Sequence, residues 1–470
     1  MLSNDESLVD TRIVNEAASL SEAGYAVSLF LPAQSAERRE ESVGGFRVHY
    51  VPPALHSRRT MLKVLAARSW RKAFRLVSDE YERQLVSSED ERQLARATPT
   101  PGLPTSSDAP GPSTSDASGA PASPARPADA VSPRPRKSGA LRFKRVVTKV
   151  FEERLVRYGL LLQEAAFARE VRAARPDIIH VHDLPMLRLG RRLAEESGAS
   201  LVYDAHEFFP FQVGMKPSAR FWYERERADI RAPDIIITVN QYLADEIRKF
   251  YGVGDIRVIY NTAPFEDHTA RRESGRARLA ERVSLPRAGG CVLLYLGYVA
   301  EQRGAFELIE ALSLLPENYV LAVLGDGDVR ERLEERINQL KLGRRVAFLG
   351  LVPREQVPAL VVGADIGLVT QKPVAVNETN CSPNRLSDYL MGGLPLALSD
   401  LPFLRWFVET YECGALFDPR DPRSMAQAIR GMFDDSERFA ALRRKALEAA
   451  RQFNWDIEGR KFLELYAGLN

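Results

Sequence analysis

The feature that most constrains the fold is a regular alternation of apolar runs and helical patterns along most of the chain. Short apolar runs, such as residues 177–182 (DIIHVH) and 291–296 (CVLLYL), alternate with segments of helical spacing. Such runs predict strands buried on both faces, and the alternation predicts parallel sheets covered by helices. A polar connection, from about residue 261 to residue 290, separates two such sets. The sequence therefore predicts an α/β protein with two Rossmann-like, doubly wound domains and a cleft between them.

The order of these segments sets the expected domain bounds. We expect an N-terminal domain over residues 1–265, a C-terminal domain over 290–453, and a last helix over 454–470 that could cross back to the first domain. Residues 96–138 are rich in Pro, Ser and Ala and poor in bulky apolar residues, which predicts a disordered insert. No strand precedes the helix expected at residues 10–23. Either the first sheet lacks its first strand, or the start of the chain lies upstream of Met1.

Composition excludes several classes of protein. The net charge of +2 gives no indication of nucleic-acid binding. Three scattered cysteines are too few for a disulfide framework or a zinc cluster, and we expect them to be reduced thiols in a cytoplasmic protein. No apolar run approaches about 18 residues, so no transmembrane helix is predicted, and the first residues do not form a signal peptide.

Two segments concentrate positive charge. Residues 57–75 carry seven basic residues and no acidic one, and residues 134–154 carry eight basic and two acidic residues. One interpretation is a pair of solvated helix faces. The other is docking on an anionic membrane surface or an anionic acceptor, which would hold the protein peripherally on the inner face of a membrane.

Polar residues follow the strands expected in the first half of the chain. His182 and Asp183 end one strand, and His206 and Glu207 follow the next. A histidine at such a position can donate to a substrate hydroxyl, or can simply bond loop backbone. His180 and His182 are expected to point to opposite faces of the sheet, so no metal site is predicted there.

The second half of the chain holds two further candidate segments. In residues 297–304 (GYVAEQRG), Gly297 would let a ligand approach the backbone and Arg303 could pair with a phosphate. Residues 382–400 read as a loop, a helix, a Gly-Gly stop and a buried strand, with Arg385 and Asp388 available to a phosphate and to sugar hydroxyls. The alternative is an ordinary helix–strand unit. Neither a G-x-G-x-x-G at a first strand nor a P-loop is present, so dinucleotide oxidoreduction and P-loop chemistry have no motif.

With these motifs in this order, the chain resembles the family 4 (group 1) retaining glycosyltransferases of the GT-B fold. The resemblance is carried by eight segments: PDIIHVHDLP (176–185), LVYDAHEFFP (201–210), PDIIITVNQYLADEI (233–247), VIYNTAP (258–264), LYLGYVAEQRGAFELIEAL (294–312), VLGDGD (323–328), FLGLVPREQVPALVVGADIGLV (348–369) and SPNRLSDYLMGGLPLALSD (382–400). It implies sugar transfer from a nucleotide-diphosphate sugar with retention of anomeric configuration and without metal or other cofactor. The C-terminal domain would hold the donor and the N-terminal domain the acceptor.

The resemblance also implies roles for single residues. His206 would lie beside the transferred sugar, Arg303 on the diphosphate, Val352 at the base and Asp388 at the ribose, while Asn380 would face the sugar. The full set of expected site residues follows. They are His206, Arg303 and Asn380 as catalytic residues; Gly297, Gly325, Gly327, Val352, Ser382, Pro383, Asn384, Arg385 and Asp388 as donor-binding residues; and His182, Asp183 and Glu207 on the acceptor side.

The sequence departs from the family's pattern at two places. The family commonly has two glutamates eight positions apart, where this chain has Asn380 and Asp388; Glu378 is a nearby substitute. A basic residue that often follows the strand-end glycine is here Tyr298, and Arg385 could compensate.

The function expected from these residues is therefore sugar transfer to a polysaccharide or glycolipid precursor. One alternative is a catalytically inactive GT-B binding subunit, and another is a nucleotide-sugar epimerase.

Overall fold

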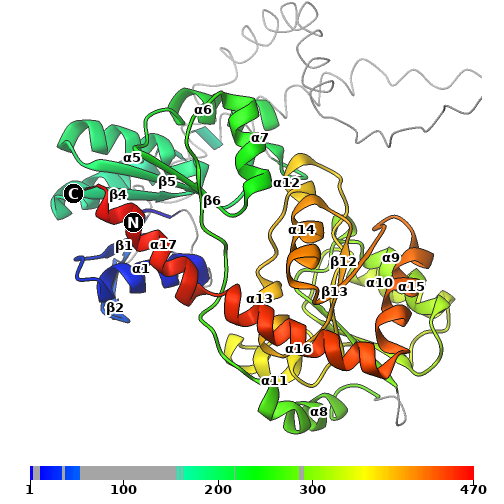
Figure 1. Cartoon of the computed structure of the whole chain (residues 1–470). Helices are drawn as coiled ribbons and strands as arrows, with labels where there is room; N and C mark the ends of the chain where they lie inside the picture. The colour runs from blue at the N-terminus through cyan, green and yellow to red at the C-terminus, as the bar shows by residue number, and fades with distance from the viewer. Residues whose placement is uncertain are drawn as a thin grey trace, which may run out of the picture. The chain divides into compact units, whose positions relative to one another are not determined.

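The computed structural model describes residues 1–3, 11–33, 38–52, 156–157, 160–161, 163–215, 218–284 and 290–469 (Figure 1). The chain divides into two compact units, Met1–Leu55 with Leu155–Asn470, and His56–Arg154. The elements named below belong to the first unit. The insert predicted at 96–138 and the basic segments at 57–75 and 134–154 lie outside the described residues.

The N-terminal half contains two strand groups. In the first, β1 (Ser28–Pro32) pairs in parallel with β3 (Phe46–Val51), and β2 (Arg39–Val43) pairs antiparallel on the other edge of β3. The second group has the order β4-β5-β6-β7 and is parallel throughout. Its strands are β4 (Ile178–His182), β5 (Ser200–Ala205), β6 (Ile235–Thr238) and β7 (Arg257–Val258).

Residues 1–3 join these two groups. Leu2 forms parallel bridges to Phe30 of β1 and to Val181 of β4, with its N–H donating to the His180 carbonyl oxygen at 2.7 Å. Of the two alternatives stated above, the empty first-strand position is corrected only in part: residues 1–3 bridge β1 and β4, but as isolated bridges and not as a strand. Three residues are too few to show an alternating pattern, so their role could not be read from the sequence.

Helices cover both faces of this sheet. They are α1 (Thr11–Glu22), α5 (Leu184–Ser197), α6 (Ala219–Asp229) and α7 (Gln241–Tyr251). Side-chain caps fix two of their starts: Ser218 accepts from the Phe221 N–H, and Asn240 accepts from the Leu243 N–H. Asn240 thus follows β6 and caps the start of α7.

The C-terminal sheet has six parallel strands in the order β10-β9-β8-β11-β12-β13. Numbered from its first strand, this is the order 3-2-1-4-5-6 of a doubly wound fold, whose ligand crevice lies where the order reverses. Here the reversal falls between β8 and β11. The strands are β8 (Cys291–Leu296), β9 (Tyr319–Leu324), β10 (Val346–Phe348), β11 (Ile366–Val369), β12 (Leu396–Ser399) and β13 (Gly414–Phe417).

Two apolar cores lie on the two faces of this sheet. Alternate residues of β8 belong to different cores, with Val292 and Leu294 in one and Leu293 and Tyr295 in the other. The first core includes residues of α8 (Arg272–Ala280), α11 (Val357–Val361), α13 (Arg385–Met391), α14 (Pro402–Tyr411) and α16 (Ser436–Gln452). The second includes residues of α9 (Ala305–Leu314), α10 (Arg330–Gln339) and α15 (Pro422–Phe433). The short helix α12 (Val376–Thr379) precedes α13.

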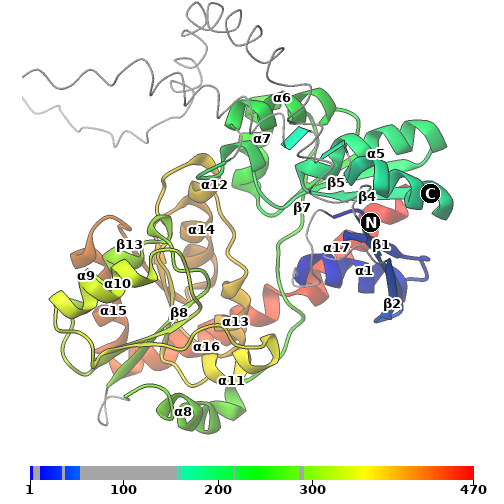
Figure 2. The same ribbon diagram turned by 180° about the vertical axis from the view of Figure 1, so that it is seen from behind.

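The last helix, α17 (Trp455–Ala467), packs against α1 of the N-terminal half; both views show the two side by side (Figures 1 and 2). Trp455 Nε1 donates to Ser19 Oγ at 2.9 Å, and Phe462 and Tyr466 are buried beside Ile13 and Ala17 of α1.

The alternating pattern predicted most of the strands and helices, but not α8, which lies inside the expected polar connection, nor the short helix α12. The edge strands β2 and β13 were not predicted either. The described residues contain no helix long and apolar enough to cross a membrane.

Candidate active site

Three glycines at the carboxyl ends of β8 and β9 let two loops pack backbone against backbone. A Cβ atom on Gly325 would lie 2.0 Å from the Gly297 carbonyl oxygen, and one on Gly327 would lie 2.0 Å from the Val299 carbonyl oxygen. The Gly297 N–H donates to the Leu324 carbonyl oxygen. No side chain larger than hydrogen fits these contacts, so the structure brings together the three glycines expected at the donor side.

Two arginine side chains converge on the same place. A Cβ atom on Gly297 would lie 3.0 Å from Arg385 Nη1 and 3.4 Å from Arg303 Nη1. Arg385 is buried; its Nη1 donates to the Leu296 carbonyl oxygen at 2.9 Å and its Nε has no partner. Burial, with the like charge of Arg385, lowers the pKa of Arg303. Among the described residues no carboxylate forms an ion pair with either guanidinium, which makes this point attractive to an anion.

The segment leading into α13 lies next to the arginine pair. Ser382 Oγ is buried without a hydrogen-bond partner, and Pro383 and Asn384 complete the turn before α13. Asp388, one turn into the helix, is paired with Arg354 through two contacts of 2.7 and 2.9 Å. The Arg354 side chain is 55% exposed, so it could move if a ligand hydroxyl replaced it on the carboxylate. Val352 is half-buried in the loop after β10.

Asn380 and Glu378 have different surroundings. Asn380 Nδ2 donates to the Val376 carbonyl oxygen, and the Asn380 backbone carbonyl accepts from Asn240 Nδ2 of the N-terminal half. Glu378 Oε1 accepts from the Val213 N–H, while Oε2 is buried without a partner. Burial raises the pKa of Glu378, and Arg303 opposes the rise. Glu378 and Glu207 are thus the carboxylates that interact with Arg303, whereas the Asn380 amide nitrogen bonds the Val376 carbonyl oxygen at the end of its own helix.

Asp183 has a strained backbone. Its φ of 61° and ψ of 162° lie in a region that glycine adopts almost alone, which costs of order 1–3 kcal/mol in another residue. The Asp183 N–H donates to the Asp204 carbonyl oxygen, and its Oδ1 accepts from the His206 N–H at 3.3 Å. Strain of this kind persists where the surrounding structure enforces it, often at functional sites.

Glu207 lies between the N-terminal strand ends and the arginines. Loss of solvent around the carboxyl, together with the negative charges of Asp183 and Glu378, raises the pKa of Glu207 to about 7. The charges of His206 and Arg303 oppose this rise. Glu207 is exposed, so its carboxyl is accessible to a ligand. A carboxyl with a pKa near 7 can both accept and release a proton at neutral pH.

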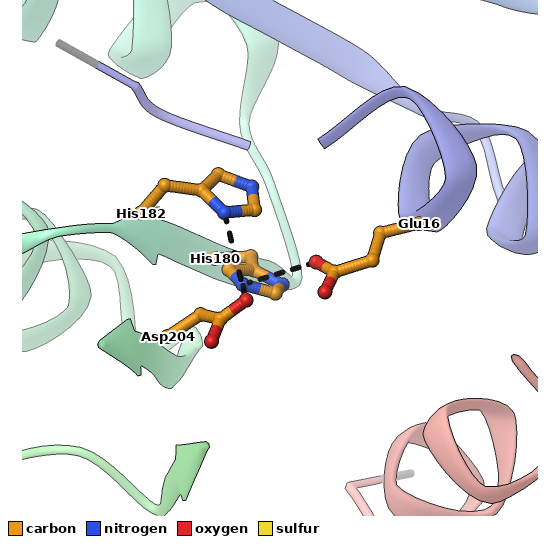
Figure 3. Close-up of side chains that lie close together, drawn as sticks. All are labelled: Glu16, His180, His182 and Asp204. Atoms are coloured by element: carbon orange, nitrogen blue, oxygen red, sulfur yellow. Dashed lines mark ion pairs between the residues drawn. The ribbon is translucent and has the colours of Figure 1, made fainter. Parts of the chain in front are cut away.

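Behind these residues lies a fully buried polar cluster, shown in Figure 3. His180 and His182 stack with ring centroids 4.3 Å apart, so the expectation that they face opposite sides of the sheet is wrong. Residues two apart on a strand share a face, because side chains alternate with a period of two. Burial lowers the pKa of both rings, which are neutral. His182 lies beneath His206, with its Nδ1 3.1 Å from His206 Nε2.

The same cluster could hold a metal ion by geometry alone, since Glu16, His180, His182 and Asp204 place ligand atoms within 4.8 Å of one another. The chain supplies a positive group of its own there. Arg12 Nε lies 2.6 Å from Asp204 Oδ2 and 3.0 Å from Glu16 Oε1, and Arg12 Nη2 lies 2.9 Å from Asp204 Oδ1. Arg12 therefore occupies carboxylate oxygens that a cation would need.

Arg12 and Glu16 were not predicted as site residues. Arg12 is 192 residues away from Asp204 in the sequence, so no local motif contains both. One signal was present: in α1 an arginine and a glutamate four residues apart share the buried face with Ile13, Ala17 and Leu20. Charged residues inside an apolar stripe indicate a buried partner elsewhere.

Comparisons with known proteins agree with this architecture. Residues 279–453 match the model "Glycosyl transferases group 1" and residues 120–266 match "Glycosyltransferase Family 4". Glycogen synthase of Mycobacterium tuberculosis is 26% identical over 330 residues, which cover 66% of this chain and 73% of that protein. D-inositol 3-phosphate glycosyltransferase 1 of Catenulispora acidiphila is 26% identical over 62% of this chain and 72% of that one.

Solved structures share the fold. Sucrose-phosphate synthase of Thermosynechococcus elongatus superposes with a TM-score of 0.66 at 16% identity, covering 100% of this chain and 98% of that one. Anabaena HepE, solved in complex with UDP-glucose, superposes with a TM-score of 0.54 at 20% identity, covering 64% of this chain and 82% of that one. The two-domain architecture is the GT-B fold.

Proposed function

Because the chain belongs to the group 1 glycosyltransferases, we propose that it transfers a sugar from a nucleotide-diphosphate sugar with retention of configuration at the anomeric carbon. The observation that carries this proposal is the convergence of Arg303 and Arg385 over Gly297. Two neighbouring cations that form no ion pair among the described residues match a diphosphate in charge. The complex of the related fold of HepE with UDP-glucose supports a nucleotide sugar as the donor.

The arginine pair also suits the chemistry of the leaving group. As the bond to the anomeric carbon breaks, negative charge develops on the diphosphate, and fixed positive groups in a site with little water stabilise that charge. Arg385 is buried and Arg303 is half-buried, so both are held by the protein and little reorganisation is needed when the charge appears. We propose that these groups do the work for which other transferases use a metal ion, so that no cofactor is required.

The remaining donor contacts follow from the positions of the other residues. Asp388 would accept from ribose hydroxyls after releasing Arg354, and the backbone near Val352 would meet the base. Ser382 Oγ and Glu378 Oε2, both buried without partners, would bond the diphosphate and the sugar hydroxyls. A polar atom buried without a partner is costly, so a bound ligand would relieve both.

The acceptor side would consist of His206, Asp183 and Glu207 at the strand ends of the N-terminal sheet. A carboxyl with a pKa near 7 and a histidine beside it offer proton acceptors for an acceptor hydroxyl. We propose a polysaccharide or glycolipid precursor as the acceptor.

Membrane docking stays a prediction from the sequence, because segments 57–75 and 134–154 lie outside the described residues. Co-sedimentation with vesicles tests it: binding to anionic vesicles should fall as salt rises and exceed binding to neutral vesicles. Equal and negligible binding to both would contradict it.

The donor is identified by thermal unfolding with a panel of nucleotide sugars. A ligand that binds the native state raises the melting temperature, and the true donor should raise it more than its free nucleotide does. Slow release of sugar from the donor without an acceptor would distinguish an active transferase from an inactive binding subunit. Stabilisation by a donor with no turnover under any condition would favour the binding subunit.

A further inference from the structure

We infer that Arg12, acting through Asp204, is a positioning residue that fixes the proton of His206 on Nε2 and so leaves Nδ1 to meet the substrate. This rests on the proposed place of His206 beside the transferred sugar. The three side chains form a buried row of contacts. Arg12 donates two hydrogen bonds of 2.6 and 2.9 Å to Asp204, and Asp204 Oδ2 lies 3.3 Å from His206 Nε2.

The negative charge in this row of contacts is that of the Asp204 carboxylate. Burial alone would raise the pKa of Asp204, but the charge of Arg12 and a hydrogen bond from His206 hold it well below its usual range. Burial and the charge of Asp204 raise the pKa of Glu16 well above its usual range. These opposite shifts favour the anionic form of Asp204 and the neutral form of Glu16, so Arg12 and Asp204 form an ion pair in a site with no exposed surface.

The negative charge of Asp204 decides which ring nitrogen of His206 carries the proton. His206 Nε2 lies between Asp204 Oδ2 at 3.3 Å and His182 Nδ1 at 3.1 Å. A proton on Nε2 can be donated toward the carboxylate and shared with His182. The other arrangement, with the proton on His182 Nδ1, would set the bare Nε2 of His206 against an anionic oxygen. Asp204 Oδ2 lies 3.3 Å from Nε2 and is fully buried, whereas Asp183 Oδ2 lies 3.8 Å from Nδ1 on a side chain that is 31% exposed, so electrostatics favours Nε2–H on His206.

The other ring nitrogen faces the candidate active site. His206 Nδ1 lies 3.8 Å from Asp183 Oδ2, on the strained residue at the end of β4. The titratable and charged groups near the ring include Asp183, Asp204, Glu207 and His182, with Arg12, Glu16 and His180 behind them. A neutral His206 with its proton on Nε2 presents a lone pair on Nδ1, which can accept from a sugar hydroxyl.

A second buried ion pair in the same half of the chain has no such connection. Arg225 pairs with Glu164, both nearly without exposed surface, and Arg225 also donates to the Pro185 carbonyl oxygen. This pair has the same chemistry as Arg12 with Asp204, but neither member contacts His206 in the bonds that the structure describes. It is therefore a matched control for the cost of breaking a buried charge pair.

The test is ¹⁵N NMR of the histidine side chains in the full-length protein at pH 8, with the His206 signal assigned from the His206→Gln variant. We expect a proton on Nε2 and a bare Nδ1 in the unmodified protein. The double variant Arg12→Met/Asp204→Asn, which removes both charges together, should shift His206 toward a mixture of tautomers. Turnover should fall at least tenfold, with the apparent donor affinity changed less than twofold. Arg12→Lys, which keeps the charge, should retain most of the Nε2–H form.

The control variant Arg225→Met/Glu164→Gln should lower the melting temperature while leaving the His206 tautomer and turnover unchanged. A bare Nε2 on His206 in the unmodified protein would overturn the inference even if no variant folds. An unchanged tautomer in a folded Arg12→Met/Asp204→Asn protein would overturn it as well. If no nucleotide sugar binds or turns over, the proposed function fails, yet the NMR result still decides whether Arg12 sets the proton on His206.

Discussion

Arg385 Nη1 donates a 2.9 Å hydrogen bond to the carbonyl oxygen of Leu296, the last residue of β8. This bond ties a guanidinium from the start of α13 to the end of the neighbouring half of the sheet, across the point where the strand order reverses. It fixes Arg385 at the crevice where a doubly wound fold binds ligands.

Replacing either arginine should weaken donor binding. Truncating a charge-assisted phosphate contact removes about 1.5–3 kcal/mol, or about tenfold to a hundredfold in affinity. We expect this for Arg303→Ala and for Arg385→Ala, measured by calorimetry with the nucleotide sugar. Arg405→Ala, which breaks a surface pair with Asp400, is the control and should leave affinity unchanged. Unaltered affinity in both site variants would remove the diphosphate site.

Gly325→Ala should separate the loops after β8 and β9. Its Cβ would lie 2.0 Å from the Gly297 carbonyl oxygen, so one backbone must move, and we expect a loss of about 1–3 kcal/mol of stability together with weaker donor binding. Gly431→Ala is the matched control. Gly431 lies in α15 with nothing near its added methyl, so the change should add about 0.5–1 kcal/mol. Urea unfolding measures both, and equal stability of the two variants would contradict the packing argument.

Asp183→Gly should trade activity for stability. Glycine relieves the φ of 61°, and after the entropy that glycine gains in the unfolded chain we expect a net rise of about 1 kcal/mol in the free energy of unfolding. Turnover should fall, because the carboxylate that accepts from the His206 N–H is lost. A variant that is less stable than the parent would show that the backbone at this position is not strained.

Glu226 should make stability depend on pH. Burial raises the pKa of Glu226 to about 7, although hydrogen bonds from Tyr251 and Tyr203 oppose the rise. The folded state then binds this proton more tightly than the unfolded state, so the contribution is complete below about pH 4.5 and is lost as pH rises toward 7. Glu226→Gln should flatten this slope in urea unfolding between pH 5 and 8. A slope identical to that of the parent would refute the assignment.

The sequence predicted the alternating strands and helices, and it predicted close backbone contacts at glycines that belong to short local motifs. Buried parallel strands such as β8 have an unmistakable apolar pattern, and the glycines at 297, 325 and 327 mark close backbone contacts that the structure contains. What it could not predict depends on partners distant in the chain. Leu2 forms its isolated bridges only because β1 and β4 lie on either side, and Arg12 is paired with a carboxylate from β5.

The contrast between Asn380 and Glu378 has the same origin. Their positions in the sequence differ by two residues, and a motif comparison favours Asn380 as the residue facing the sugar. The helix α12 turns its members in different directions, so that the Glu378 carboxyl lies near Arg303 while the Asn380 amide bonds Val376. Side-chain direction on a short helix is set by tertiary packing, which the sequence alone does not reveal.

We propose that the arginine pair supports metal-independent, retaining cleavage of a nucleotide sugar. The most direct measurement is ¹H NMR of the sugar released from UDP-glucose, and then from other nucleotide sugars, by the full-length protein in excess EDTA. An α-linked donor should yield the α-anomer first, at a rate unaffected by the chelator and lost in Arg303→Ala/Arg385→Ala. Initial release of the β-anomer, or loss of activity in EDTA that a divalent metal restores, would contradict the account.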